Sequence, residues 1–247
     1  MIDVTTNVES GTEFRIGPIF GQTVSALKGN FGTYLLLASI SIPPMAVYLL
    51  LTDSPEGIGV PGIELQVYYF TAMTLHVVLL SVAQAIIAYG VVQSLSGRDV
   101  SIGESIKQGL RRFFPLVGVA ILVMLAVYIG LVLLVIPGLW LATLFWVSIT
   151  TCVVERLGPV GSLKRSSDLS KGHRWKVFAI VAIFYFGSFG IGFGLRVLAG
   201  PTIAAWFDLV LTAILGAIGG VLAATMYSAL RRAKDGIDIQ SIAGVFE

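Results

Sequence analysis

Long apolar runs, separated by short polar segments, make up most of this 247-residue chain. A helix needs about 20 mainly apolar residues to cross the hydrocarbon core of a bilayer. Backbone groups in lipid must be satisfied within the segment, which favours helices for runs of this length. The pattern predicts an all-α, polytopic bundle of six transmembrane helices, a single domain over residues 15–235. The predicted spans cover about residues 31–51, 67–95, 116–136, 139–154, 177–198 and 206–230.

Two proline-containing motifs shape these predicted spans. Pro43 and Pro44 fall inside the first span, where they remove two backbone donors and crowd the preceding turn, so a kink is expected. Pro137 and Gly138 lie between the third and fourth spans. We expect this pair to form nearly the whole connection of a tight helical hairpin.

A short amphipathic helix is predicted before each odd-numbered span. The segment 101–104 has the spacing of a capping box, with Ser101 as N-cap and Glu104 reaching back. The segment 158–175 shows the weakest pattern of the three. In residues 17–31 the apolar face consists of Phe20, Val24, Leu27 and Phe31, and after Ser101 it consists of Ile102, Ile106, Leu110, Phe113 and Phe114. Such helices either lie in the membrane interface, with basic residues toward anionic headgroups, or are connectors packed against their own bundle.

The composition excludes a soluble globule. Apolar residues make up 56% of the chain and charged residues 12%, whereas soluble domains are about 25% charged. The net charge of +2 is too small to indicate nucleic-acid binding. The lone cysteine, Cys152, has no partner within the chain and gives no information on the redox compartment.

Lysine and arginine are distributed very unevenly between the two predicted sides. One side receives 15 of the 16 basic residues, and the other receives only Arg196. Because basic residues near span ends favour the cytoplasm, both termini, namely the flexible segment 1–14 and the tail 236–247, are predicted to be cytoplasmic.

The second span carries the candidate intramembrane polar site, His76 and Gln84. An ionisable residue inside a membrane is a functional hypothesis by default, here a proton relay or a ligand site. The alternative is a neutral histidine hydrogen-bonded across a helix interface. The neighbouring hydroxyl residues and Gln84 either line a hydrophilic path or bond to neighbouring helices.

Polar residues at the two membrane surfaces support three further hypotheses. Glu155 is predicted to anchor the third surface helix by pairing with Lys164, Arg165 or Arg174, a structural role preferred over acid–base catalysis. Arg196 and Asp208 are predicted to form an ion pair at the outer surface. The candidate contacts to lipid headgroups are Lys107, Arg111, Lys164, Arg165, Arg174 and Trp175, although topology alone also explains the charge.

Glycines at four-residue spacing occur in the last two spans, at Gly190 and Gly194 and at Gly216 and Gly220. This spacing favours close helix packing between the fifth and sixth spans or between protomers. Motifs of hydrolases and primary pumps are missing from the sequence, including GxxxxGK[ST], HExxH, CxxC and GxSxG. We therefore expect neither an enzyme nor a cofactor.

Several motifs resemble a family of bacterial membrane proteins. They are FRIG (14–17), IPGLWL (136–141), VERLGP (154–159), LKRS (163–166), KGHRW (171–175) and LRRAKDGI (230–237). The family is the glycerophosphoryl diester phosphodiesterase membrane domain, or a related uncharacterised inner-membrane family. The resemblance implies a six-helix bundle in the bacterial inner membrane, but no active site, because no segment here is long or polar enough to be the catalytic barrel of the fused relatives.

Three functions remain open at this point. The preferred one is a non-enzymatic inner-membrane protein that organises lipid or a membrane protein complex, with membrane lipids, a membrane protein or a second copy as partners. The alternative is a small transporter or channel for a lipid or small amphiphile, its path shaped by Pro43, Pro44 and the polar residues of the second span. The third is a membrane-embedded enzyme or the membrane half of a separately encoded phosphodiesterase.

Overall fold

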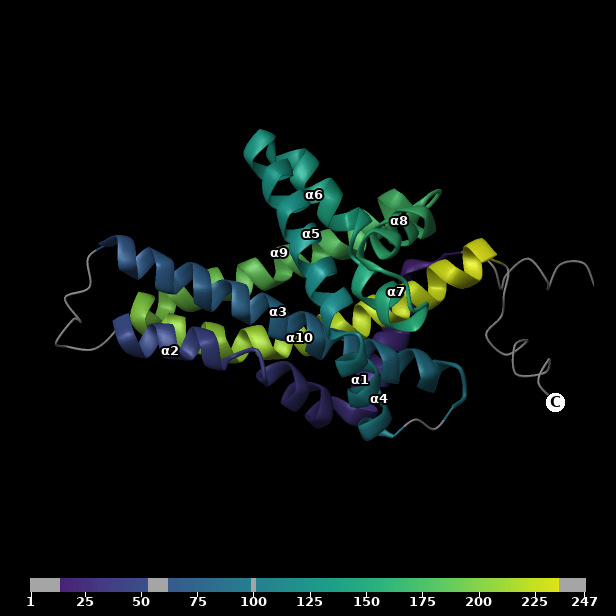
Figure 1. The fold of residues 1–247 in the computed structure, drawn as a ribbon, viewed down its shortest axis with the longest axis horizontal. Helices are drawn as coiled ribbons and strands as arrows, with labels where there is room; N and C mark the ends of the chain where they lie inside the picture. Colours follow the sequence, from purple (N-terminus) through teal and green to yellow (C-terminus); the bar gives the residue numbers. More distant parts are fainter. Residues whose placement is uncertain (1–13, 53–61, 99–100, 236–247) are drawn as a thin grey trace, which may run out of the picture.

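Helices account for almost all of the protein in the computed structural model, which describes residues 14–52, 62–98 and 101–235. No strand occurs among these residues, which confirms the predicted all-α bundle. The helices, shown in Figure 1, are α1 (Ile16–Ser39), α2 (Pro43–Thr52), α3 (Gly62–Leu95), α4 (Ile102–Arg111), α5 (Phe113–Leu133), α6 (Val135–Leu144), α7 (Ser148–Val154), α8 (Pro159–Ser170), α9 (Arg174–Ala199) and α10 (Pro201–Asp235).

The centre of the bundle is formed by α3 and α10, which run along its long axis beside α9 (Figure 1). Small residues on α10 bring the two central helices close together. A Cβ atom at Gly216 would lie 2.8 Å from Leu80, and one at Gly220 would lie 3.3 Å from Ile87. Gly216 and Gly220 thus pack against α3, the second span, so the prediction that they pack against the fifth span was wrong for this pair. A Cβ atom at Gly190 or Gly194 on α9 would have no neighbour within 4 Å, so this pair makes no close contact with the described part of the chain.

The apolar helices are long enough for a multi-pass membrane protein. Among the described residues, five helical segments are of sufficient length and hydropathy to cross a membrane, with residues 136–154 of α6 and α7 taken as one segment, and α1 with α2 gives a sixth if this bent pair is one span. Many large apolar side chains cover the outside of the bundle, among them Phe186, Phe189 and Phe193 on α9. That arrangement is expected where the surroundings are lipid rather than water.

The predicted kink in the first span is present as a break. Residues Ile40–Ile42 separate α1 from α2, and the two helices meet at a bend of 50°. Pro43 and Pro44 begin α2, where a proline costs little because the first N–H groups of a helix have no acceptor within it. A second irregularity, at Asn30 with φ −143°, divides α1 near the predicted boundary between the surface helix and the span.

The hairpin of α5 and α6 differs from its predicted form in two respects. Its connection is Leu134, which has extended backbone angles, whereas Pro137 and Gly138 lie in the first turn of α6. The prediction that this pair forms the connection was wrong, because a proline fits a first helical turn as well as a loop. Gly138 instead lets the hairpin close, since its Cα would be 2.8 Å from a Cβ at Gly130. The predicted fourth span is also interrupted, by turns at residues 145–147 between α6 and α7.

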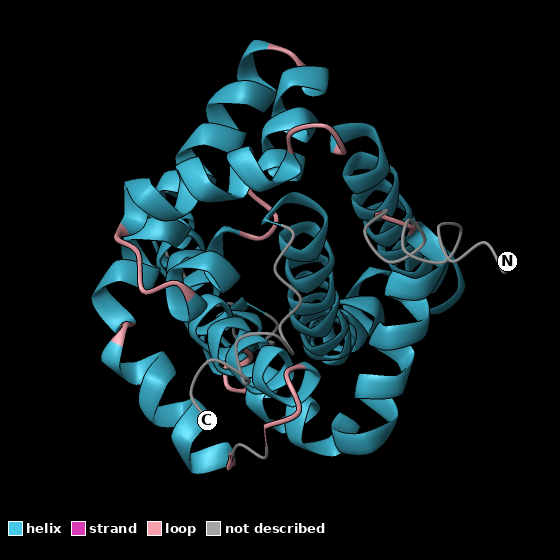
Figure 2. Ribbon diagram, turned by 90° about the vertical axis from the view of Figure 1, so that its right-hand side faces the viewer, coloured by secondary structure: helices cyan, strands magenta, loops and turns pink. Residues whose placement is uncertain are grey.

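Only the first half of α5 is packed into the bundle. Leu116, Val119 and Ala120 are buried, but Tyr128 and Leu133 are exposed. In Figures 1 and 2 the hairpin rises away from the axis of α3, α9 and α10. Half-way along α6, Trp140 contacts Trp175 at the start of α9, with ring centroids 5.3 Å apart.

The two ends of the bundle differ in charge. We call the end that holds α4, α8, the start of α1 and the end of α10 the basic end, since the predicted cytoplasmic lysines and arginines lie on these elements and their connections. Arg196 lies at the opposite end, where it pairs with Asp208 at 3.0 Å as predicted. Most of the predicted N-terminus and the whole tail 236–247 lie outside the described residues. Phe14, however, is buried and stacks on His173, so it belongs to the folded domain.

Candidate functional site at the basic end

Helix α4 contacts the bundle through its small residues. Ser101 caps it by accepting a hydrogen bond from the Glu104 backbone N–H, as predicted. Ser105 and Gly109 are buried against α3, and a Cβ at Gly109 would lie 2.4 Å from Ile86 Cγ1. Because these residues let α4 approach α3 closely, its larger apolar side chains are left at the edge of the contact.

The apolar stripe of α4 is mostly turned outward. Leu110 is 56% exposed and Ile102 is 52% exposed, while Phe114 at the start of α5 is 85% exposed. Ile106 and Phe113 pack partly against the core. Lys107 and Arg111 are exposed beside this stripe. The arrangement combines an outward apolar edge with adjacent cations, which is the pattern of a helix at a membrane interface.

The first surface helix, the part of α1 before Asn30, has a different role. Ile19 and Thr23 are buried, and the Thr23 hydroxyl is 2.8 Å from that of Thr225 on α10. Of the predicted apolar face, Phe20 and Leu27 pack partly against the core and Val24 and Phe31 are exposed. This segment is therefore a connector packed against its own bundle, because threonine and isoleucine on its other face bind it to α10.

Helix α8 docks through a face of serines. Ser162, Ser166 and Ser170, spaced at one helical turn, are buried. The Ser166 hydroxyl donates to the Leu144 carbonyl at 2.7 Å, and the Thr151 hydroxyl donates to the Ser162 carbonyl at 3.1 Å. Ser166 thus replaces an apolar contact by a hydrogen bond to the end of α6, whereas the hydroxyls of Ser162 and Ser170 donate to carbonyls one turn earlier, at Gly158 and Ser166. That explains why the apolar pattern of this segment is weak in the sequence.

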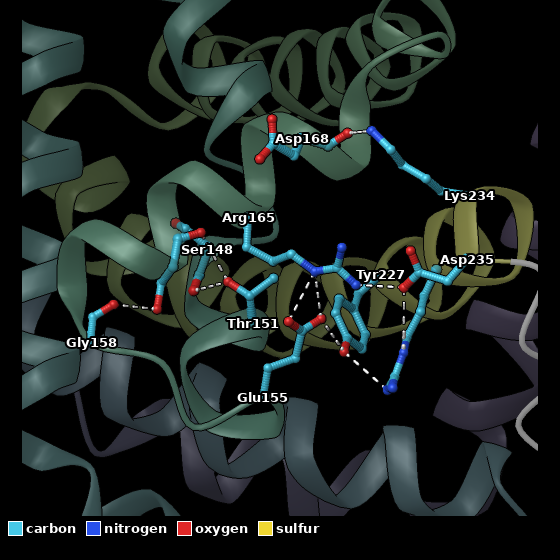
Figure 3. Close-up of polar contacts among 11 residues, drawn as sticks. Ser148, Thr151, Glu155, Gly158, Arg165, Asp168, Tyr227, Lys234 and Asp235 are labelled. Carbon is cyan, nitrogen blue, oxygen red and sulfur yellow. Dashed lines mark hydrogen bonds and ion pairs between the residues drawn. The ribbon is translucent and has the colours of Figure 1, made fainter. Parts of the chain in front are cut away.

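An ionic cluster joins α7, α8 and α10 (Figure 3). The guanidinium of Arg165 donates to both carboxylate oxygens of Glu155, at 3.0 and 2.9 Å, and to Asp235 at 2.5 Å. The hydroxyl of Tyr227 donates to Glu155 at 2.9 Å and accepts from Arg231 at 3.3 Å. Of the three partners predicted for Glu155, Arg165 is the one with which it forms an ion pair in the structure. Tyr227 and Asp235 were missed because they lie 72 and 70 residues away in sequence from Glu155 and Arg165, respectively.

The contacts of the cluster favour the charged form of Arg165. Partial burial alone would lower the pKa of Arg165, but its hydrogen bonds to Asp235 and Glu155, together with their charges, raise the pKa above the ordinary arginine value. At the surface of α8, a hydrogen bond from Lys171 lowers the pKa of Asp168. Lys234 also donates to the Asp168 backbone carbonyl. We call the contacts of Arg165 with Glu155 and Asp235 the clamp, because they fix α8 to the end of α10.

The candidate headgroup contacts fall into two groups. Lys107, Arg111 and Lys164 are exposed, and Trp175 is 74% exposed beside Trp140. Arg165 is engaged by the clamp and Arg174 is only partly exposed, with its Nε buried. The first group is therefore accessible to a lipid surface, and Arg165 is not.

His76 and Gln84 have separate surroundings. The Nδ1 atom of His76 is 2.6 Å from the Ser41 carbonyl, at the break between α1 and α2, which fits the interpretation of a hydrogen bond between helices. Gln84 lies about two turns farther along α3 and lines a cavity between helices. The structure therefore does not bring the two residues into one site.

The sequence did not predict a polar groove that lies at the basic end. It has a volume of about 470 Å³ between α1, α3 and α4, and its polar lining includes Asn30, Ser94, Arg98 and Ser101. The polar residues after α3 are a weak signal of this groove, since a short loop between two helices has the same composition. Only the packing of α4 across α3 turns them into a lined surface.

The described part of the chain contains no group of three or more histidine, cysteine, aspartate or glutamate side chains able to hold a metal ion. No protein family model, curated protein or solved structure matches the chain. The resemblance to the phosphodiesterase membrane domain therefore stays a prediction based on the motifs.

Proposed function

We propose that this protein is a non-enzymatic, multi-pass protein of the bacterial inner membrane that organises lipid in the cytoplasmic leaflet. The proposal rests above all on the placement of α4. This helix is fixed to the bundle by Ser105 and Gly109, while Leu110 and Phe114 point outward beside Lys107 and Arg111. A rigidly held apolar edge with adjacent cations suits insertion between headgroups.

The orientation is part of the proposal. Basic residues concentrate at one end of the bundle, and only Arg196 lies at the other. Because positively charged segments remain in the cytoplasm, the basic end would face the cytoplasmic leaflet. Each lysine or arginine near an anionic surface contributes about 1 kcal/mol of attraction, so Lys107, Arg111 and Lys164 together would enrich anionic lipid around α4 and α8.

The depth of α4 in a membrane tests the first part of this proposal. In a Cys152→Ala background, a nitroxide at Leu110→Cys is compared with one at Gln108→Cys in the full-length protein, reconstituted in vesicles containing phosphatidylglycerol. We expect the nitroxide at position 110 to collide more often with oxygen than with a water-soluble nickel chelate. The nitroxide at position 108 should collide more often with the chelate. Equal access of the chelate to both positions would contradict an interfacial α4.

Lipid organisation is then measured directly. Spin-labelled phosphatidylglycerol reports the fraction of lipid that the protein immobilises. We expect the double change Ile102→Asp and Leu110→Asp to reduce this fraction, because buried apolar area drives the insertion. Gln108→Asp adds one carboxylate outside the stripe and is the control for the single change Leu110→Asp, which is measured beside the double variant. An unchanged fraction in the double variant would refute the role of α4.

The transporter alternative finds support in one place. His76 is bonded to the Ser41 backbone and the proline pair begins α2, so both serve the helix break. Of the predicted path residues, Ser81 and Gln84 line a cavity in the apolar part of the bundle.

A further inference from the structure

A cavity of about 560 Å³ lies among α3, α5, α7, α9 and α10 and the end of α6. It exists because only the first half of α5 packs into the bundle, while the rest of the hairpin diverges from it (Figure 1). Its walls are mainly apolar and include Leu80, Val123, Met124, Phe184 and Leu215. The volume falls within the range of about 300–1,000 Å³ that is typical of small-molecule sites.

Most hydroxyl groups in the lining already have partners. Ser81 donates to the Val78 carbonyl, Ser188 to Phe184 and Thr212 to Asp208. Three other polar groups, those of Trp146, Gln84 and Tyr185, have none among the described residues. The indole Nε1–H of Trp146 is buried and unpaired, and no hydrogen bond is recorded for the amide of Gln84.

The Trp146 Nε1–H is buried, so its lack of a partner is costly, and Gln84 is partly buried. Gln84 precedes the end of α3 by 11 residues, which is about 16 Å of helix, so it lies well inside the apolar part of the bundle. A buried donor without a partner costs about 1–3 kcal/mol. Water is a poor candidate because apolar cavities remain dry. A ligand with an apolar body and a hydrogen-bonding group would satisfy both the walls and the two polar side chains.

We propose that this cavity binds a single-chain amphiphile whose polar end is a neutral hydroxyl, such as a long-chain alcohol. Its chain would lie along Val123, Met124 and Leu215, and its hydroxyl would meet the Gln84 amide, which can both donate and accept, and the Trp146 indole, which donates. No residue of the lining is charged, so a carboxylate or a phosphate would be buried without a counter-ion at high cost. The site is separate from α4 and does not rest on its interfacial role.

Fluorescence of Trp146 tests this site. The changes Trp140→Phe, Trp175→Phe and Trp206→Phe leave Trp146 as the reporter in the full-length protein, and the probe is a dibrominated octadecanol, since bromine quenches tryptophan at short range. We expect saturable quenching at one probe per protein. The corresponding dibrominated carboxylate, ionised at alkaline pH, should bind at least about tenfold more weakly, as expected when a charge replaces a hydrogen-bonded neutral group.

Matched variants distinguish the cavity from partitioning into detergent. Gln84→Leu should weaken binding of the alcohol about tenfold, whereas Gln93→Leu, on the opposite face of the same helix, should not. Ala142→Phe fills the cavity and should abolish saturable quenching, whereas Ala126→Phe, on α5 outside the lining, should not. Quenching that is unsaturable, equal for alcohol and carboxylate, or unaffected by Ala142→Phe would overturn the proposal.

Mass spectrometry of the native chain with unmodified octadecanol provides an independent readout, which does not depend on the tryptophan changes. We expect one alcohol to be retained per chain, and none in the Ala142→Phe variant. Retention that is equal in both would overturn the cavity site. Ile102→Asp with Leu110→Asp should leave alcohol binding unchanged, so failure of this site and failure of the lipid-organising role are distinguishable.

Discussion

His76 completes the hydrogen bonding of Ser41, a residue 35 positions away at the break between α1 and α2. The Nδ1 atom lies 2.6 Å from the Ser41 carbonyl oxygen, and since a carbonyl only accepts, Nδ1 carries the proton. Continuing the helix would require the N–H of Met45 to bond to Ser41, but that N–H bonds to Ile42 instead. The histidine therefore supplies a donor where the break has removed one.

Replacing His76 by alanine should destabilise the protein by about 1–3 kcal/mol, because the Ser41 carbonyl would remain buried without a donor. Unfolding of the purified protein in mixed micelles with increasing denaturing detergent measures the loss. His76→Gln retains a side-chain N–H and should recover part of it, and Gln93→Ala serves as the control. A His76→Ala variant of normal stability that lost proton-coupled flux would instead favour a relay.

The clamp between Arg165 and Glu155 should show a measurable coupling energy. Both side chains are mostly buried, and a hydrogen bond to a charged group contributes about 1.5–3 kcal/mol. We expect a double-mutant cycle of Arg165→Met and Glu155→Gln to give a coupling in this range. Hydrogen exchange of the α8 amides should accelerate in either single variant.

The exposed pair of Lys171 and Asp168 provides the comparison for that cycle. Lys171 is 58% exposed, and exposed ion pairs contribute at most about 1 kcal/mol. The coupling energy of Lys171 with Asp168 should therefore be smaller than that of Arg165 with Glu155. Equal coupling energies for the two pairs would show that the clamp adds nothing beyond a surface contact.

Two glycines of α4 should respond in opposite directions to the same change. Gly109→Ala should displace α4 and cost about 1–3 kcal/mol, because its Cβ would lie 2.4 Å from Ile86. Gly103→Ala meets nothing closer than 3.9 Å and should gain up to about 1 kcal/mol from helix propensity. Thermal unfolding of the two variants measures both effects, and a destabilising Gly103→Ala would contradict the described packing of α4.

Closure of the α5–α6 hairpin should depend on Gly130. A Cβ there would lie 2.8 Å from the Cα of Gly138, and backbone atoms cannot move aside as a side chain can. We expect Gly130→Ala to lower stability by about 1–3 kcal/mol. Gly187→Ala on α9, where no atom lies within 4 Å, should be nearly neutral. If the two variants unfold alike, the close approach of the hairpin helices is not maintained in the membrane.

The apolar runs predicted the spans, apart from the interruption of the fourth at residues 145–147, because they depend on local hydropathy and on the need to satisfy the backbone in lipid. The kink at Pro43 and the cap at Ser101 were predictable for the same reason, since both arise from neighbouring residues. The hairpin connection was mislocated by three residues, because Pro137 and Gly138 fit a loop and a first helical turn equally well and only their packing on Gly130 distinguishes the two.

The sequence by itself determined what surrounds this protein: its composition requires apolar surroundings, and its charge asymmetry predicts which end faces the cytoplasm. Only the tertiary structure decided which face of each amphipathic helix contacts the bundle and which is turned outward. Both α1 and α4 have amphipathic patterns, yet α1 is bound to α10 through Thr23 and Thr225, whereas α4 approaches α3 through Gly109 and turns Leu110 outward. Periodicity records which residues share a face, but contact depends on the shape of the opposing helix. For the same reason, the cavity beside Gln84 and the distant partners of Arg165 emerged only when the helices were placed together.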